Sequence, residues 1–233
     1  LLTKELTQFY GVSLLLSIEY LHERKFIYRD LKPENVMVLY SNGYIKLIDF
    51  GTAKQISERT STIIGTPHYM APEVILGGGY SFQVDIWSIA ICMYEFMCGG
   101  VPFGESAEDP MEVYLAIINI KLQFPPFCKD KEFKQLMIHM LCKNPINRLT
   151  KINQIKNHVW FQNFNWEELM SLNMKPGYKV RENKSQSNVG NNEHIPYVDY
   201  AMKNYKEWEP SKGAKEKITE EKMKEFEKWY DKF

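Results

Sequence analysis

Apolar side chains recur at helical spacing over the first part of the chain, between Thr3 and Arg24. The positions that carry this spacing are Phe9, Val12, Leu15, Leu16 and Tyr20. Residues three or four positions apart lie on the same face of an α-helix, so the pattern predicts one long amphipathic helix. A basic turn that leads into Lys25 is expected to end it.

Two short apolar runs around a polar turn follow, over residues 36–40 and 44–48. The turn is Ser41-Asn42-Gly43, and an Asn-Gly pair tolerates the positive φ angles of a tight turn. The pattern therefore predicts a β-hairpin. Asn35 precedes the first strand and Asp49 follows the second, so both lie at the open end of the hairpin, away from the turn. Because the two strands run side by side, these residues are expected to lie close together.

The next pattern is a polar stretch followed by a strongly apolar one. Residues 52–70 are rich in Thr, Ser and Gly and are expected to form a loop. The run 84–98 is almost continuously apolar, which predicts a helix buried in a protein core. Together with the residues up to 103 it approaches the length of a membrane span. Because Asp85 and Glu95 interrupt it, we expect no membrane-spanning segment.

Shorter helices are predicted over 110–122, 130–142 and 150–158, with proline-containing breaks between them. The composition changes beyond Trp160, since residues 161–166 are rich in aromatic side chains, whereas residues 175–217 are polar and contain few aliphatic ones. We expect a tail there rather than a second core, with a last amphipathic helix over 219–233. The whole pattern predicts an α+β protein that is mainly helical and contains one short β-hairpin.

Composition and charge narrow the range of functions. The 233 residues carry 29 Lys and Arg against 29 Asp and Glu, so no overall field favours a nucleic acid or an acidic membrane, and we expect neither partner. The four cysteines are Cys92, Cys98, Cys128 and Cys142. They have no C-x-x-C spacing and lie among apolar residues, which favours buried thiols and a reducing, cytoplasmic compartment.

Candidate chemistry is concentrated in the stretch from Tyr28 to Asn35, which combines a carboxylate at Asp30, an ammonium group at Lys32 and an amide at Asn35. Phosphoryl transfer needs a base for a hydroxyl proton, a cation for the moving phosphate and oxygen ligands for a metal. Oxygen atoms of Asn35 and Asp49 could share Mg²⁺ with the phosphates of a nucleotide. The stretch therefore favours an enzyme that transfers phosphoryl groups.

Three motifs occur in order: Tyr28-Arg29-Asp30-Leu31-Lys32-Pro33-Glu34-Asn35, Asp49-Phe50-Gly51 and Ala71-Pro72-Glu73. In this order and at these spacings they resemble the catalytic core of protein kinases. Tyr28, which stands where most kinases have His, and the run Gly65-Thr66-Pro67-His68-Tyr69-Met70 are similar to the AGC group of serine/threonine kinases. The resemblance implies a mainly helical C-terminal kinase lobe over 1–166 and an extended AGC-type tail over 167–233.

Within the AGC group the chain resembles cGMP-dependent protein kinases. The residues that carry this resemblance are Asp109-Pro110-Met111, Phe164-Asn165-Trp166 and the terminal Trp229-Tyr230-Asp231-Lys232-Phe233. Catalytic subunits of the cAMP-dependent type share the core and remain an alternative. The resemblance implies ATP and Mg²⁺ as cofactors and protein substrates as partners.

The resemblance also implies a role for each motif residue. Asp30 would orient and deprotonate the substrate hydroxyl, and Lys32 would neutralise the γ-phosphate of ATP. Asn35 and Asp49 would hold the Mg²⁺ ions, with Asp49 and Lys32 also contacting the nucleotide. Thr66 would tie Asp30 and Lys32 together.

Other positions would support this site. Met37 would lie under the adenine, and Asp85 would anchor the catalytic loop from the buried helix. Glu73 and Arg148 would form a buried, structural ion pair.

Residues 52–70 would be the activation segment. Thr62 matches the phosphorylated threonine of AGC kinases, and its phosphate would pair with Arg29 and Lys54 and order the loop. Thr60 and Ser61 are better explained as ordinary loop hydroxyls.

Substrate choice can be argued from charge. Glu34 and Glu95 match acidic positions that read arginine upstream of the acceptor, because carboxylates pair well with guanidinium groups. We therefore expect protein substrates with Arg or Lys before the phosphorylated residue. Ile63, Pro67 and Met70 would line an apolar pocket for the residue after it.

The sequence contains no Gly-rich phosphate loop and no strand lysine of the VAIK type. We therefore expect an N-terminal lobe, and cyclic-nucleotide-binding domains if the closer resemblance holds, elsewhere in a longer protein, and negligible activity from this chain alone. A catalytically silent pseudokinase or scaffold is the main alternative. The presence of all four residues Asp30, Lys32, Asn35 and Asp49 disfavours it. A small-molecule phosphotransferase is disfavoured by the activation segment.

Overall fold

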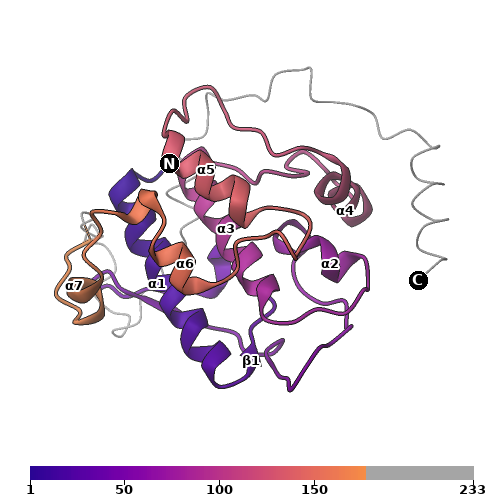
Figure 1. Ribbon diagram of the computed structural model, residues 1–233, viewed down its shortest axis with the longest axis horizontal. Coiled ribbons are helices and arrows are strands. Elements are labelled where there is room, and N and C mark those ends of the chain that lie inside the picture. Colours follow the sequence, from indigo (N-terminus) through magenta and orange to yellow (C-terminus); the bar gives the residue numbers. More distant parts are fainter. Residues whose placement is uncertain (177–233) are drawn as a thin grey trace, which may run out of the picture.

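Two long helices form the centre of the computed structural model, which describes residues 1–176 (Figure 1). Helix α1 spans Lys4–Glu23 and packs against α3, which spans Gln83–Cys98. The side chain of Thr3 caps the start of α1 by accepting a hydrogen bond from the backbone N–H of Leu6 at 3.3 Å. The helices predicted over 3–24 and 84–98 are both confirmed.

The predicted β-hairpin is also present, with strands shorter than expected. Strand β2 (Val36–Val38) pairs antiparallel with β3 (Ile45–Leu47), and Val36 lies opposite Leu47. Gly43 has a φ of 75°, which the turn requires and glycine adopts without strain. At the open end, the backbone N–H of Ile48 donates to the carbonyl of Asn35 at 3.0 Å, so the hairpin fixes the distance between the two flanking residues.

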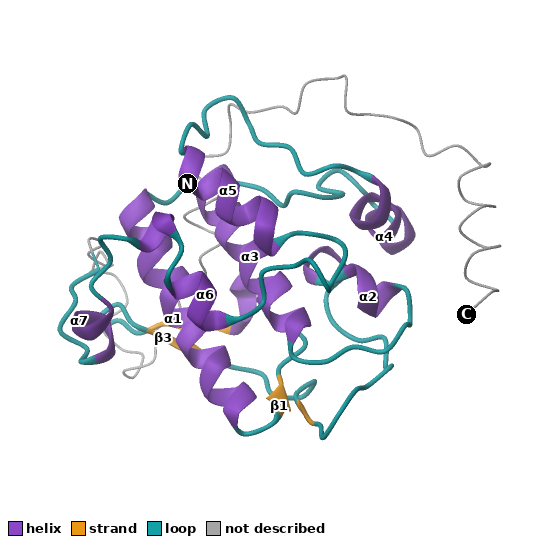
Figure 2. Cartoon of the chain, in the orientation of Figure 1, coloured by secondary structure: helices purple, strands orange, loops and turns teal. Residues whose placement is uncertain are grey.

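A second pair of strands was not predicted. Strand β1 (Phe26–Ile27) pairs antiparallel with β4 (Lys54–Gln55), and Figure 2 shows β1 just past the end of α1. The interpretation of 52–70 as a continuous loop is therefore wrong at β4, and also at the short 3-10 helix η2 (Pro67–Tyr69). Two-residue strands are too short to show the alternation of apolar and polar residues by which a strand is recognised.

The remaining helices are short and surround the central pair. They are η1 (Pro33–Asn35), α2 (Pro72–Ile75), α4 (Pro110–Asn119), α5 (Lys131–Met140), α6 (Ile152–Lys156), η3 (Val159–Phe161) and α7 (Trp166–Met170). Helix α5 packs on α3, whereas α4 lies to one side against α2 and η2 (Figure 1).

The three helices predicted beyond residue 110 exist but are shorter than expected. Side chains of Asp109 and Asp130 cap α4 and α5 by accepting backbone N–H bonds at 2.8 and 2.9 Å, which fixes where these helices begin. Ile120 has an extended backbone with ψ of 135°, so α4 ends before it although the apolar pattern continues. The spacing of apolar residues alone does not predict where α4 ends.

The expected boundary at residue 166 falls at the first residue of α7. Beyond α7, the hydroxyl of Tyr44 donates to the carbonyl of Met174 at 3.0 Å, so the start of the expected tail contacts the hairpin. The rest of the expected tail, including the helix predicted over 219–233, lies outside the described residues. Within residues 1–176, no helix combines the length and apolar character needed to cross a membrane.

Candidate active site

The loop from Tyr28 to Lys32 is anchored from the buried helix α3. Asp85, in the first turn of α3, is fully buried, and its carboxylate accepts the backbone N–H groups of Tyr28 and Arg29 at 2.9 and 2.8 Å. It also lies 2.8 Å from Nε2 of His22 at the end of α1. Arg29 has a φ of 72°, which is costly for a residue with a side chain. The two bonds from Asp85 hold the loop in this conformation.

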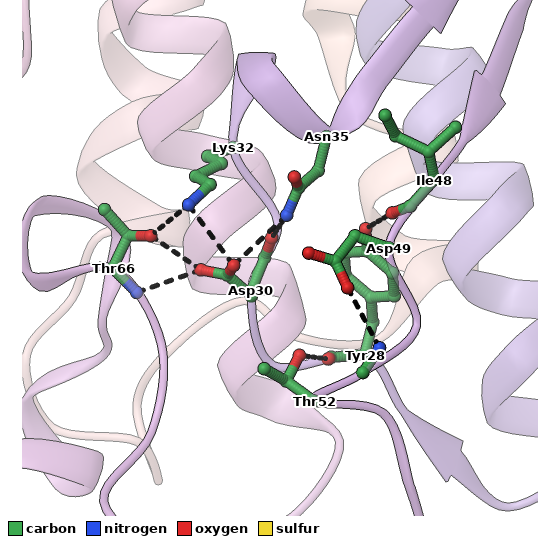
Figure 3. A network of polar contacts seen from close by, with 9 residues as sticks. Tyr28, Asp30, Lys32, Asn35, Ile48, Asp49, Thr52 and Thr66 are labelled. Carbon is green, nitrogen blue, oxygen red and sulfur yellow. Dashed lines mark hydrogen bonds and ion pairs between the residues drawn. The ribbon is translucent and has the colours of Figure 1, made fainter.

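Asp30, Lys32 and Thr66 form one connected polar cluster (Figure 3). The ammonium of Lys32 lies 3.3 Å from Oδ2 of Asp30 and donates to Oγ1 of Thr66 at 2.7 Å. Thr66 in turn donates to Oδ1 of Asp30 from its backbone N–H at 2.9 Å and from its hydroxyl at 2.7 Å. The carboxylate therefore has one orientation, fixed by the activation segment and by its own loop.

Asn35 joins this cluster from the opposite side. Its Nδ2 donates to the backbone carbonyl of Asp30 at 2.8 Å and to Oδ2 of the same residue at 3.1 Å. Because Nδ2 makes these two bonds, the carbonyl oxygen of the side chain is the atom suited to a cation. Asp49 lies beyond the partner strand, is exposed, and has a φ of 56°. Its Oδ1 accepts the backbone N–H of Gly51 at 3.1 Å.

Tyr28 links the catalytic loop to the segment around Asp49, a role that the sequence interpretation missed. Its hydroxyl donates to the carbonyl of Ile48, and its own carbonyl accepts the hydroxyl of Thr52 at 2.9 Å (Figure 3). Its ring also packs edge-on against that of Phe50, with the ring centroids 5.3 Å apart. Burial, with the charges of Asp30 and Asp49, raises the pKa of Tyr28, so the phenol stays a neutral donor.

Glu73 and Arg148 meet in a buried, two-pronged ion pair. Nη1 and Nη2 of Arg148 donate to the two carboxylate oxygens of Glu73, each at 2.7 Å. The guanidinium also donates to the carbonyls of Cys142 and Lys143 and lies over the ring of Trp87, 4.8 Å from its centroid. The pair joins α2, which follows the activation segment, to the loop after α5.

The threonines of the activation segment, and the two cations expected to pair with a phosphate on Thr62, lie in different environments. Lys54 donates to the hydroxyl of Thr60 at 3.0 Å, and Thr60 is buried and pairs with the backbone of Tyr80. Thr62 is exposed, and its carbonyl accepts the hydroxyl of Tyr80 at 2.5 Å. Arg29 donates from Nε to the carbonyl of Thr52 at 2.6 Å, while its buried Nη1 has no hydrogen-bond partner within residues 1–176.

The two glutamates expected to read basic substrates differ in environment. Glu34 is exposed in η1, whereas Glu95, on α3, accepts the hydroxyl of Tyr69 at 2.8 Å. Burial raises the pKa of Glu95 to about 7; the bond from Tyr69 opposes this shift, and the charges of Glu34 and Glu105 add to it.

The three residues expected to line an apolar pocket differ in how far their side chains are exposed. Ile63 is 46% exposed and Pro67 begins η2, but Met70 is only 4% exposed and belongs to the core. Met37 is partly buried in the middle of β2.

The oxygen donors for a metal ion are few in the described part of the chain. Within residues 1–176 there is no group of three His, Cys, Asp or Glu side chains that could hold one. Asn35 and Asp49 supply two hard oxygen donors, which suit Mg²⁺ in a site completed by phosphate oxygens.

The fold is mainly helical with short antiparallel strand pairs, and its polar cluster lies on a loop with the residue pattern of a protein-kinase catalytic loop. Comparison with known proteins agrees, because the protein kinase domain family matches residues 1–161. The chain belongs to this family.

Its relatives include cyclic-nucleotide-dependent kinases. It is 49% identical over 180 residues to a cGMP-dependent protein kinase of Toxoplasma gondii and 48% identical to that of Plasmodium berghei, matches that cover 76% of this chain. A cAMP-dependent protein kinase type 3 of Saccharomyces cerevisiae is 36% identical over 197 residues, which is 83% of this chain and 48% of that protein. The matched region spans only 18% and 21% of the two cGMP-dependent relatives.

Proposed function

We propose that this chain is the C-terminal lobe and tail of a cytoplasmic serine/threonine protein kinase that transfers the γ-phosphate of ATP to proteins and that is regulated by cGMP in a longer polypeptide. The observation that carries the proposal is the cluster of Asp30, Lys32, Thr66 and Asn35, in which each polar group has a fixed partner. Preorganised charge of this kind is what phosphoryl transfer requires, since most of its catalysis is positioning and electrostatics.

Asp30 is the proposed base. Thr66 donates twice to its Oδ1, and Lys32 and Asn35 lie at its Oδ2. These contacts hold the carboxylate in the orientation in which it accepts the proton of a substrate hydroxyl. The side chain of Asp30 is 13% exposed, so its surroundings keep most water away from the carboxylate.

Lys32 is the proposed partner of the γ-phosphate. Its ammonium is held between Asp30 and Thr66 and is 22% exposed, so it can reach a phosphate without leaving the cluster. Mg²⁺, when held by Asn35 and Asp49, would add positive charge beside the phosphates and fix their orientation. Met37 would contact the adenine from β2.

Phosphorylation of Thr62 is part of the proposal. The exposed position of Thr62 makes it available to a modifying kinase, and the unpartnered Nη1 of Arg29 is a donor suited to a phosphate oxygen. Lys54, whose ammonium donates to the hydroxyl of Thr60 two positions before Thr62, would be the second cation to pair with the phosphate. Arg29 and Asp30 are neighbours in the same loop, so a phosphate on Thr62 that pairs with Arg29 would connect the activation segment to Asp30.

Substrates with upstream basic residues are the third part. Burial is the main cause of the raised pKa of Glu95, and the negative charge of Glu34 lies close enough to add to it. Two neighbouring carboxylates favour a guanidinium or ammonium group between them.

The experiment uses the full-length kinase that contains this chain, Mg-ATP, and two matched peptides. One peptide carries a Ser or Thr acceptor with two upstream Arg, and the other has Ala in place of both Arg. We expect transfer to the first peptide with a kcat/KM at least tenfold above that for the second, corresponding to about 1.4 kcal/mol. Absence of transfer to any peptide would favour the scaffold alternative instead.

Addition of cGMP tests the regulatory part separately. We expect cGMP to raise transfer by the full-length kinase and cAMP to do so only at higher concentration. If transfer responds to neither nucleotide, or responds to cAMP at a lower concentration than to cGMP, the cGMP assignment is removed. The kinase assignment stays intact in both cases.

A further inference from the structure

The segment that contains Thr62 is attached to the loop before α3 by a group of hydrogen bonds. The backbones of Thr60 and Tyr80 pair as an antiparallel bridge, in which each N–H donates to the other residue's carbonyl, at 2.9 and 2.8 Å. The guanidinium of Arg59 also donates to the carbonyl of Gly79. Thr60 and Tyr80 are 6% and 1% exposed, so the bridge is shielded from competing water.

The side chain of Tyr80 adds a bond two residues further along the segment. Its hydroxyl donates to the carbonyl of Thr62 at 2.5 Å. That carbonyl belongs to the peptide unit between Thr62 and Ile63, and a peptide unit is planar. The hydroxyl of Tyr80 therefore fixes the direction in which the chain enters Ile63.

Ile63 and the next residue, Ile64, differ in environment. Ile64 lines a small internal cavity together with Tyr80 and with Val84 at the start of α3. Ile63 is 46% exposed. With Ile64 packed inward beside Tyr80, the side chain of Ile63 is left on the outer surface of the segment.

The following residues are fixed at the catalytic loop. Thr66 donates to the carboxylate of Asp30 from its N–H at 2.9 Å and from its hydroxyl at 2.7 Å. Gly65 approaches the same loop so closely that an added Cβ would lie 2.7 Å from the carbonyl oxygen of Arg29. Ile63 is therefore held between two fixed points, the bonds from the Tyr80 loop on one side and the catalytic loop on the other.

We propose that Tyr80 is a positioning residue for protein substrates, which presents Ile63 to the substrate residue that follows the acceptor. The proposal rests on the proposed kinase activity and on the expected place of Ile63 in the apolar pocket for that residue. Tyr80 acts through Ile63 and does not itself touch substrate, because it is buried. Without its hydroxyl, the peptide unit between Thr62 and Ile63 is freer to rotate, so binding of an apolar substrate residue weakens.

The first experiment measures amide hydrogen exchange in the full-length kinase and in its Tyr80→Phe variant, which keeps the buried ring and loses only the hydroxyl. We expect the amide of Thr60 to exchange faster by about fivefold or more in the variant. The matched control is Tyr94→Phe, which removes a buried hydroxyl that donates to the carbonyl of Gln123 at 2.8 Å, near the other end of α3. The control should leave Thr60 unchanged. Equal acceleration in both variants, or none in Tyr80→Phe, would overturn the proposal.

The second experiment measures peptide kinetics with the same proteins. Two peptides carry the upstream Arg and differ only in the residue after the acceptor, which is Leu in one and Asn in the other. In Tyr80→Phe we expect KM for the Leu peptide to rise about threefold or more, while KM for the Asn peptide and both kcat values stay within about twofold. A loss confined to kcat, or an equal rise in both KM values, would show a general structural effect and refute the positioning role.

Arg59→Ala provides a second variant, because this exposed side chain can be removed without disturbing the core. It should change exchange of Thr60 and KM for the Leu peptide in the same direction as Tyr80→Phe and by a smaller factor. If the unmodified kinase transfers phosphate to neither peptide, the proposed function itself is wrong. If it transfers phosphate and Tyr80→Phe leaves both the exchange and the two KM values unchanged, only the role of Tyr80 is wrong.

Discussion

At the scale of single residues, the environment of Glu95 would make the proposed binding of basic substrates sensitive to pH. Its carboxylate accepts the hydroxyl of Tyr69, and burial raises its pKa to about 7. Below pH 7 the neutral form predominates and pairs weakly with an arginine of the substrate. Above pH 7 the charged form predominates and pairs strongly.

We therefore predict that the preference for the Arg peptide over the Ala peptide rises between pH 6 and pH 8 in the full-length kinase. In Glu95→Gln, kcat/KM for the Arg peptide should fall roughly tenfold to a hundredfold at pH 8, since a charged hydrogen bond contributes about 1.5–3 kcal/mol. The preference should also become independent of pH. A preference that rises with pH equally in both proteins would assign the titration to another group.

The residues of the catalytic loop could be predicted because they are close together in the sequence. Asp30, Lys32 and Asn35 lie within six positions, so their motif is readable before any fold is known. The contacts of Tyr28 with Ile48 and of His22 with Asp85 could not, because the partners are 20 and 63 positions apart and neither contact leaves a local pattern.

At the scale of elements, the ion pair of Glu73 and Arg148 determines how α2 is held. We predict that Arg148→Met lowers the free energy of unfolding by about 3–5 kcal/mol, because the buried carboxylate of Glu73 would lose its partner. The matched control is Lys156→Met, which breaks a pair with Glu19 that is also 2.7 Å long but partly exposed. Its expected cost is about 1 kcal/mol or less. Chemical denaturation measures both, and equal losses would contradict a special role for the buried pair.

The hairpin turn offers a second test at this scale. Gly43 has a φ of 75°, and a Cβ added there would lie 2.4 Å from Cγ of Pro176. Gly43→Ala should therefore lower the free energy of unfolding by about 1–2 kcal/mol. Gly78→Ala, at a glycine whose added Cβ would meet no atom within 4 Å, should change it by about 0.5 kcal/mol or less. The two variants are compared by urea denaturation, and equal effects would show that the turn tolerates a side chain.

Long periodic elements were predictable, and short ones were not. Helices α1 and α3 and the hairpin each repeat a pattern over enough residues to be recognised. Strands β1 and β4 contain two residues each, and their pairing is decided by the path of the chain around the catalytic loop. The C-terminal ends of α4 and α5 were placed two or three residues too late, because at α4 the apolar spacing continues past Ile120, whose backbone is already extended.

At the scale of the whole molecule, we propose that residues 1–176 supply one wall of an active site. Asp30, Lys32, Asn35 and Asp49 lie along the hairpin and the catalytic loop, and the exposed side chains of Ile48 and Phe50 lie beside them. We propose that the opposite wall, which holds ATP from above, comes from the N-terminal lobe of the longer protein. The chain by itself is then expected to transfer phosphate at a negligible rate, whereas the full-length kinase is active.

The most direct test of this account compares the full-length kinase with its Asp30→Asn variant, which keeps the size of the side chain but removes the base. Phosphoryl transfer to the Arg peptide and the dissociation constant of Mg-ATP are measured for both. We predict that kcat falls by a factor of about 10² to 10⁴ in the variant while Mg-ATP binding is unchanged within about twofold. A variant that transfers phosphate at the rate of the unmodified kinase would contradict the assignment of Asp30 and, with it, the proposed active site.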